Sequence, residues 1–322
     1  MRALITGASG FAGSWLCRDC AAAGDTVVAL SRSGVVPEGS GQGVAVDLRD
    51  AAAVESAVRS ARPEVVYHLA ALTSVARSWE APAETLSDNV TGSVNLLEGL
   101  RAAAPAARVV WVSSCEVYGE PAVLPVPEDA SLRPANPYAV SKASGELLAE
   151  LYGDSYGLEI VRARPFSHSG PGQSPIFLLS NLARQAAQGR RDGVSSLRIV
   201  TGNPDTRRDF TDVRDIVRAY RLLATGDTTG DVYNVSSGVS VSAGEQVALL
   251  AELLGTIRVE HEIDPARVRP HEVMDLRGDP TRLTALTGWK PHIPLRQTIS
   301  DTIQWWEQQL DSHAAGAAHR PA

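Results

Sequence analysis

A short apolar strand leads directly into a glycine-rich loop and then a helix at the start of this chain. Residues 1–6 read MRALIT, and the next residues carry Gly7, Gly10 and Gly13 before a helical pattern that ends near residue 23. Glycines at this spacing permit a tight turn, close approach of the backbone to a pyrophosphate, and close packing of helix on strand. The free N–H groups at the start of the helix attract the same anion. The motif predicts a dinucleotide-binding site with contacts from Gly7, Ser9, Gly10, Phe11, Ala12 and Gly13.

Strands and helices alternate through the first half of the chain. Helical patterns at 84–103 and 138–156 lie among apolar runs that predict strands at 26–30, 44–48, 65–71, 109–112 and 159–164. This alternation predicts an α/β fold built on a Rossmann-type doubly wound parallel sheet.

The character of the chain changes at Pro165, where a loop dense in glycine and proline begins. Beyond it we expect a smaller C-terminal α/β lobe over the open end of the sheet, with helices at 177–189, 212–223, 242–254 and 298–310 and strands at 197–201 and 232–236. The predicted domains are a dinucleotide-binding domain at 1–165, with its sheet completed by 231–238, and a mainly substrate-binding lobe at 166–311. Residues 312–322 lack periodicity and are predicted to be disordered.

The composition is that of an ordinary globular protein. Of the 322 residues, 44% are hydrophobic and 21% charged, and the net charge of −7 argues against a nucleic-acid surface. Because no apolar run reaches the length of a membrane span and the N-terminus enters a strand directly, we expect neither a span nor a signal peptide. Three cysteines fit a reducing cytoplasm. Cys17 and Cys20 lie inside a helical pattern, which favours two small helix residues over a redox or zinc pair, and no metal site is predicted.

A serine at a strand end and a Tyr-x-x-x-Lys pair on the next helix form the candidate catalytic set. Ser114 follows the apolar run 109–112, and ligands bind outside the carboxyl ends of strands in an open parallel sheet. Tyr138 and Lys142 are four residues apart, so both lie on one helix face. A cation one turn from a phenol lowers the pKa of that phenol. Ser114 can then hold a substrate oxygen whose proton Tyr138 takes, which suits hydride transfer between a carbinol and a nicotinamide.

Other strand ends complete the predicted cofactor site. The second strand ends at Ser31 and Arg32, where an NAD site usually has an acid; this arginine suits a 2′-phosphate, so NADP is favoured over NAD. His68 is predicted to be a packed strand residue rather than a catalyst. Asn89, a poor helix former, is either a polar link between active-site strands or a solvent-facing residue. The remaining predicted cofactor contacts are Asp47, Leu48, Leu69, Ala70, Ala71, Tyr138, Lys142 and Pro165.

Further motifs occur in the order typical of one enzyme family. They are H-L-A-A at 68–71, S-x-x-V-Y-G at 114–119, Y-x-x-x-K at 138–142, G-P-G at 170–172, R-R-D-F at 207–210 and G-W-K-P at 288–291. With the glycine loop, they resemble the extended short-chain dehydrogenase/reductases of the NAD-dependent epimerase/dehydratase type that act on nucleotide sugars. The likeness covers residues 1 to about 310. The second half, above all A-R-P-F-S-H-S-G-P-G-Q at 163–173, is most similar to GDP-mannose 4,6-dehydratases and GDP-4-keto-6-deoxymannose reductases.

This resemblance implies roles for residues of both halves. Ser114, Tyr138 and Lys142 match the family's catalytic residues, and two arginines match those that clamp the substrate diphosphate. The family commonly has asparagine at the position of Ser167, so this chain departs from the family pattern at a position that helps hold the substrate. The predicted substrate contacts are Thr73, Ser74, Ser167, Arg208 and Arg269.

The resemblance leaves the reaction open between two classes. Family dehydratases place an acid–base pair after the catalytic hydroxyl, where this chain has Cys115 and Glu116. The pair favours C4 oxidation of a GDP-hexose followed by proton chemistry at C5, as in a dehydratase or an epimerase. Cys115 is alternatively a small buried residue. The second hypothesis is an NADPH-dependent reductase of a 4-keto-6-deoxy nucleotide sugar, which the likeness of the whole chain favours.

Two further expectations concern a non-catalytic role and the oligomeric state. A non-catalytic dinucleotide sensor is disfavoured because Tyr138 and Lys142 are both present. Relatives pair through helices that match 84–103 and 142–156, so a homodimer is expected.

Overall fold

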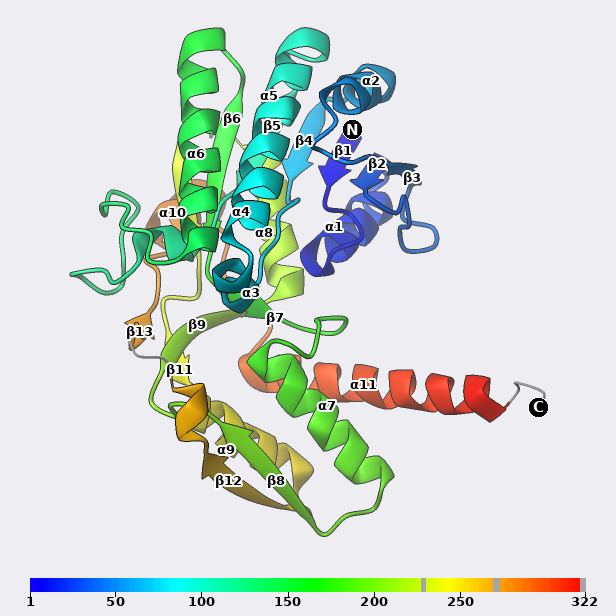
Figure 1. The fold of residues 1–322 in the computed structure, drawn as a ribbon, viewed down its shortest axis with the longest axis vertical. Helices are drawn as coiled ribbons and strands as arrows, with labels where there is room; N and C mark the ends of the chain where they lie inside the picture. Colours follow the sequence, from blue (N-terminus) through cyan, green and yellow to red (C-terminus); the bar gives the residue numbers. More distant parts are fainter. Residues whose placement is uncertain (227–229, 269–272, 319–322) are drawn as a thin grey trace.

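Seven strands form the main sheet of the molecule (Figure 1). The computed structural model describes residues 1–226, 230–268 and 273–318. The strand order is β10-β6-β5-β4-β1-β2-β3, and every neighbouring pair is parallel. The predicted α/β fold with a Rossmann-type sheet is confirmed. The strands are β1 (Arg2–Thr6), β2 (Thr26–Ser31), β3 (Gln42–Ala45), β4 (Val65–His68), β5 (Arg108–Val112), β6 (Ile160–Pro165) and β10 (Val232–Val235).

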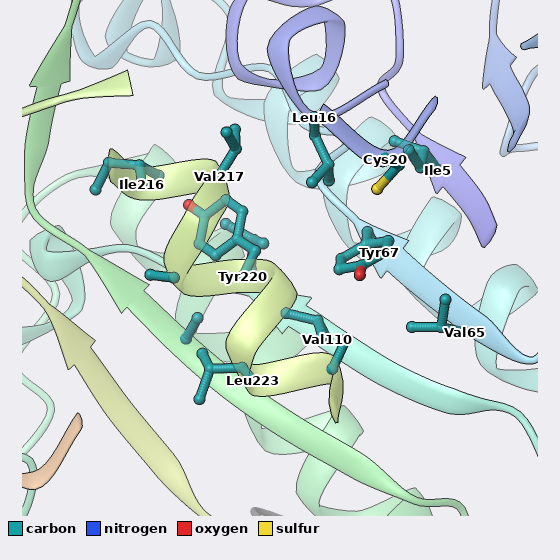
Figure 2. Close-up of a cluster of buried hydrophobic side chains, with 14 of the residues drawn as sticks. Ile5, Leu16, Cys20, Val65, Tyr67, Val110, Ile216, Val217, Tyr220 and Leu223 are labelled. Carbon is teal, nitrogen blue, oxygen red and sulfur yellow. The ribbon is translucent and has the colours of Figure 1, made fainter. Parts of the chain in front are cut away.

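Helices cover both faces of this sheet, and each face has its own apolar core. Helices α1 (Phe11–Ala22) and α8 (Val213–Thr225) pack on one face, where Cys20 and Tyr220 belong to one buried cluster (Figure 2). Cys17 is buried in the same cluster, so the C-x-x-C pair consists of two small helix residues, as predicted. The helices on the other face are α2 (Ala51–Ala61), α5 (Gly92–Ala103) and α6 (Pro137–Tyr156).

The rest of the chain forms a smaller lobe with a separate apolar core. Figure 1 shows this lobe beyond the ends to which the β1 and β4 arrows point. Its core lies between α7 (Leu178–Arg191), α9 (Ala243–Leu254) and α11 (Leu295–Ala318). One small sheet contains β7 (Ser167–Ser169), β9 (Arg207–Asp212), β11 (Ser240–Ser242) and β13 (Asp275–Leu276), and the other pairs β8 (Ser196–Thr201) with β12 (Arg258–Ile263). The domain boundaries drawn from the sequence stay a prediction.

Two strands end earlier than predicted because their last residues turn away from the sheet. Strand β3 ends at Ala45, and the chain then makes a turn in which Asp50 N–H donates to the Asp47 carbonyl oxygen at 3.0 Å. Strand β4 ends at His68, since the N–H of Ala70 donates to the side-chain hydroxyl of Thr6 on β1 at 3.3 Å instead of to a backbone carbonyl.

Two helices also differ from the prediction. The helix expected at 84–103 consists of α4 (Pro82–Leu86), a π-helical turn η1 (Ser87–Thr91) and α5. Helix α11 continues past residue 312, so the tail predicted to be disordered is helical up to Ala318. Alanine, the strongest helix former, fills most of positions 314–318. Among the described residues, no helix combines the length and the apolar character that crossing a membrane requires. The remaining short helices are α3 (Val75–Glu80), α10 (Thr281–Thr287), η2 (Cys115–Tyr118) and η3 (Pro265–Arg267).

A buried aspartate joins the smaller lobe to the main sheet. The Asp209 carboxylate accepts hydrogen bonds from the N–H of Ser237 at 2.9 Å, from its hydroxyl at 2.6 Å and from the N–H of Gly238 at 2.9 Å. Ser237 and Gly238 follow β10, the edge strand of the main sheet. Because Arg208 precedes Asp209 on β9, this contact also sets where Arg208 lies relative to the sheet.

We predict that Asp209→Ala lowers the free energy of unfolding by about 3 kcal/mol, because it leaves several buried N–H and O–H groups without an acceptor. Urea unfolding measures the change. Asp205→Ala, at an exposed position before the same strand, is the control and should leave the midpoint in place. Equal midpoints for both variants would contradict the role of Asp209.

Candidate active site

Two of the candidate catalytic residues meet at the carboxyl edge of the sheet. Ser114 follows β5 and caps η2, where its hydroxyl accepts a hydrogen bond from Glu116 N–H at 3.2 Å. Tyr138 lies in the first turn of α6, and its phenol is close enough to the Ser114 hydroxyl for that group to lower the pKa of the phenol. Both side chains are buried. The fold therefore places two hydroxyl groups side by side at the edge where parallel sheets bind ligands.

Burial controls the protonation of Tyr138 and Lys142. The Lys142 ammonium donates to the carbonyl oxygen of Val112 at the end of β5. Burial lowers the pKa of Lys142 to about 8, and the carboxylate of Glu146 opposes this effect. Burial raises the pKa of Tyr138, and the nearby Ser114 hydroxyl only partly offsets this rise. The expected lowering of the Tyr138 pKa by Lys142 is not observed, so the phenol is protonated at neutral pH.

Asn136, which was not among the predicted site residues, links the Tyr138 helix to the Ser114 turn. Its Oδ1 accepts a hydrogen bond from Ala139 N–H at 2.8 Å and caps α6, while its Nδ2 donates to the Glu116 carboxylate at 3.0 Å. The signal was present, because asparagine directly before Pro137 is a typical helix cap followed by proline at the first helical position. One amide thus orients both the helix and Glu116.

Cys115 is enclosed by apolar side chains. It belongs to a buried cluster with Val117, Phe166 and Leu276, and 5% of its surface is exposed. Burial raises the pKa of its thiol well above the usual range, and the negative charge of Glu116 acts in the same direction. The thiol is therefore protonated at neutral pH and is not available there as a base.

The glycine loop leaves no room for side chains at two positions. Gly7 has a φ of +72°, and a Cβ there would lie 2.8 Å from the backbone of Ala70. A Cβ at Gly13 would lie 2.2 Å from the carbonyl oxygen of Gly7. Gly10 is the residue before α1, with Phe11 and Ala12 half-buried in its first turn and Ser9 exposed. The loop is a backbone cradle at a helix N-terminus, which fits the pyrophosphate of a dinucleotide.

Two arginines and two aspartates lie beyond the ends of β2 and β3. Arg32, exposed after Ser31, lies 3.9 Å from Asp88. Arg49, which was not among the predicted site residues, lies 3.3 Å from Asp88 and binds the Asp47 carboxylate at 2.6 Å. The Arg49 hydrogen bonds hold the pKa of Asp47 at about 2. Asp47 is thus ionised and paired with Arg49, whereas the contact of Arg32 is long and exposed to solvent.

Asn89 holds the loop after β4 against the helix that carries Lys142. From the π-helical turn η1, its Oδ1 accepts a hydrogen bond from Leu72 N–H at 2.7 Å. Its Nδ2 donates to the Leu72 carbonyl at 3.2 Å and to the Ser141 hydroxyl at 2.8 Å. Asn89 is therefore a polar link, and the alternative of a solvent-facing residue is wrong.

His68 is a packed residue, as predicted. Its ring lies 4.3 Å from that of Trp111, and Nδ1 hydrogen bonds with the Thr6 hydroxyl at 2.8 Å. Burial lowers the pKa of His68 to about 3, so it is neutral. The three residues after His68 also lie at the site. Leu69 N–H donates to the Thr6 carbonyl, and Ala70 and Ala71 line a small polar cavity with Lys142.

Leu48 follows Asp47 in the chain. Its carbonyl oxygen accepts a hydrogen bond from the Asn95 side chain.

The predicted substrate residues come from two separate parts of the chain. Thr73 is exposed, and Ser74 caps α3 by accepting a hydrogen bond from Arg77 N–H at 3.2 Å. Ser167 begins β7, two residues after Pro165 ends β6.

Arg208 lies near the Ser114 turn although it comes from the smaller lobe. Its Nη1 donates to the carbonyl oxygen of Val273 at 2.8 Å, and its charge lowers the pKa of the Cys115 thiol, against the larger effect of burial. Arg269, the second predicted diphosphate arginine, lies outside the described residues.

The comparison with known proteins identifies the family. Residues 4–302 match the model described as GDP-mannose 4,6 dehydratase. The chain belongs to this family. The resemblance to nucleotide-sugar short-chain dehydrogenase/reductases that the motifs predicted is therefore confirmed.

Individual members of this group differ in their reactions. The chain is 41% identical over 253 residues to the GDP-6-deoxy-D-mannose reductase of Pseudomonas aeruginosa, covering 77% of this chain and 82% of the reductase. The structure of RMD from Pseudomonas aeruginosa complexed with NADPH has a TM-score of 0.83 and 34% identity, covering 96% of this chain and 100% of that one. An NAD-dependent NDP-hexosamine 5,6-dehydratase of tunicamycin biosynthesis also has a TM-score of 0.83, at 32% identity, covering 95% and 97%.

We predict that Lys142 titrates with a midpoint near pH 8 in the protein without added ligands. The sequence contains two lysines, Lys142 and the exposed Lys290, so ¹³Cε lysine NMR should show two signals. Lys142→Met should remove the signal that titrates near pH 8. Since the pKa of Lys142 falls from 10.5 to about 8 on folding, the unfolded chain binds more protons between these values, and the free energy of unfolding should rise with pH there. Two signals with the same midpoint would contradict the prediction.

Proposed function

We propose that this protein is a nucleotide-sugar oxidoreductase that uses a nicotinamide cofactor for hydride transfer at C4 of the hexose. The placing of the Ser114 hydroxyl near the Tyr138 phenol, with Lys142 one turn further along α6, carries the proposal. The glycine loop is part of the same edge, because Gly7 touches Ala70, and Ala70 lines a cavity with Lys142.

The three side chains suit proton transfer to a carbonyl oxygen. The nicotinamide supplies the hydride when it is bound. The Ser114 hydroxyl holds the carbonyl oxygen of the sugar, and Tyr138, protonated because burial raises its pKa, donates its phenolic proton to that oxygen. The Lys142 ammonium then balances the charge of the phenolate that remains.

Reduction of a 4-keto-6-deoxy nucleotide sugar, such as GDP-4-keto-6-deoxymannose, is the reaction that we favour. A protonated Tyr138 is the form that ketone reduction requires. Proton removal from C5 by Cys115 would require a thiolate, and burial disfavours that form. The 41% identity with a GDP-6-deoxy-D-mannose reductase supports the same reaction.

One observation favours the second candidate, C4 oxidation followed by C5 proton chemistry in a dehydratase or epimerase. The half-buried Glu116 carboxylate is held by Asn136, and its charge acts on both Cys115 and Tyr138. A carboxylate fixed in this position can accept a proton, and the protonated thiol beside it can donate one.

We infer a preference for NADP over NAD from the end of β2. Arg32 is exposed, and its contact with Asp88, at 3.9 Å, is long enough for a competing 2′-phosphate to replace it. The acid typical of NAD sites is absent from this strand end, where the described residues are Ser31, Arg32 and Ser33. The related RMD structure contains NADPH, whereas the related 5,6-dehydratase is NAD-dependent.

Arg208 is proposed to bind the substrate diphosphate, since a guanidinium matches the geometry of phosphate oxygens. Its place beside Cys115 would bring the diphosphate near the reacting sugar. Thr73, Ser74, Ser167 and Arg269 stay predicted substrate contacts. A reducing cytoplasmic location stays a prediction that the three unbridged cysteines support.

The decisive assay offers the protein GDP-4-keto-6-deoxymannose with NADPH or NADH and follows oxidation of the cofactor by its ultraviolet absorbance. We expect a higher kcat/KM with NADPH. Tyr138→Phe should lower kcat by about 10²–10⁴-fold, because it removes the proton donor while keeping the ring. Cys115→Ala should leave kcat within a few-fold of the parent, because the thiol is packing.

A parallel incubation with GDP-mannose in D2O, without added cofactor, tests the second candidate. Deuterium at C5 or a 4-keto-6-deoxy product by NMR, together with no reduction of the keto sugar, would overturn the reductase in favour of C5 chemistry. In that case Cys115→Ala and Glu116→Gln should each abolish the exchange.

We also propose a homodimer formed through α6. Val140, Leu147 and Leu151 lie on this helix at spacings of seven and four and are 40%, 55% and 54% exposed. Leu86 of α4, which packs beside α6, is 37% exposed. Burying this stripe against its copy in a second molecule would remove it from water.

Leu147→Glu combined with Leu151→Glu should convert the dimer to a monomer, because it places charges in the apolar contact. Light scattering at micromolar concentration measures the mass. Ile263→Glu, at an equally exposed position on β12 in the smaller lobe, is the control and should leave the dimer intact. A monomeric parent protein would refute the proposal.

A further inference from the structure

A fully buried ion pair connects α6 to β6 next to the candidate site. The Nε and Nη2 of Arg164 donate to the Glu146 carboxylate at 3.0 and 2.5 Å. The side chains are 6% and 1% exposed. Taking two charges out of water is costly, and apolar replacements of such pairs are often neutral for stability. Stability alone is therefore a weak reason for this pair.

The same guanidinium also holds the turn that begins at Ser114. Arg164 Nη1 donates to the Tyr118 hydroxyl at 2.7 Å, and its charged group lies 4.8 Å from the centre of the Tyr118 ring. Tyr118 is the last residue of η2, whose cap is Ser114. The Tyr118 hydroxyl in turn donates to Asn234 on β10 at 2.7 Å. One buried arginine thus touches both elements that carry the candidate catalytic groups.

The network also reaches the smaller lobe. Arg164 Nη1 donates to the Glu128 carbonyl at 2.9 Å, and Asn234 donates to the Val126 carbonyl at 2.9 Å. Val126 N–H bonds to the carbonyl oxygen of Arg277, which follows β13. The ion pair therefore lies where α6, the Ser114 turn and the loop between them meet, and this loop contacts the residue that follows β13.

We propose that Glu146 and Arg164 are positioning residues, which hold Tyr138 and Lys142 on α6 against the Ser114 turn. The proposal rests on the proposed hydride-transfer function. Glu146 lies one helical turn beyond Lys142, so its carboxylate also faces the Lys142 ammonium. Arg164 neutralises the Glu146 carboxylate from the β6 side. Among the described residues, the neutral His68 of β4 lines the same small cavity as Lys142, and the Val112 carbonyl of β5 accepts a hydrogen bond from the ammonium.

The chain contains a matched control pair on the same two elements. Glu150 on α6 binds Arg162 on β6 at 2.8 Å, one turn further along the helix and two residues earlier on the strand. Glu150 is 45% exposed. Removing its charge tests the effect of losing an ion pair between α6 and β6 without disturbing the Tyr118 contact.

The test compares Glu146→Gln with Glu150→Gln by two readouts. ¹³Cε lysine NMR needs no substrate; in Glu146→Gln the Lys142 midpoint should fall by about one pH unit, because a facing negative charge is lost. In the proposed reductase assay, kcat/KM per folded molecule should fall about tenfold or more, since the proton donor is misplaced. Glu150→Gln should change neither quantity. Lower thermal stability of Glu146→Gln with an unchanged midpoint and kcat/KM would overturn the proposal.

If Glu146→Gln does not fold, the double variant Glu146→Leu with Arg164→Met replaces the ion pair by apolar side chains of similar size. A smaller fall in the Lys142 midpoint is expected, because the positive charge of Arg164 is lost together with the carboxylate, and an unchanged midpoint and kcat/KM would again overturn the proposal. A parent protein that shows no reductase activity would refute the proposed function, whereas the NMR comparison would still decide whether Glu146 acts on Lys142.

Discussion

Parallel pairing of all seven strands is the constraint on which the rest of the structure depends. It brings the carboxyl ends of β1, β4 and β5 to one edge, although the residues that follow them are far apart in sequence. The glycine loop, the 69–71 backbone and Ser114 are neighbours for this reason. Helix α6 then needs only to begin at this edge for Tyr138 to reach Ser114.

Buried polar contacts convert this shared edge into a defined site. Asn89 joins the loop after β4 to α6, Asn136 joins α6 to Glu116, and Asp209 joins the smaller lobe to the turn after β10. Each of these side chains uses several hydrogen-bonding atoms at once. An apolar residue of the same size could fill the space but would leave buried N–H groups unpaired. Few other residue types are therefore compatible with these positions.

Local patterns predicted much of the site, and the misses have physical causes. The Gly7 loop and the Tyr138–Lys142 spacing are local, so they could be read directly from the sequence. The role of Asn89 could not, because its partners, Leu72 and Ser141, lie in different elements. Arg49 was missed for a similar reason, since its pairing with Asp88 requires a contact between the turn after β3 and the π-helical turn η1.

The sequence by itself determined the fold class, the family and the residue types at the sheet edge, because periodicity, glycine spacing and motif order are properties of neighbouring residues. Only the tertiary structure decided how those residues are protonated. Cys115 and Tyr138 retain their protons and Lys142 has a lowered pKa because distant segments bury them. The effect of desolvation on a pKa depends on all the residues packed around the group, and those residues come together only when the chain folds.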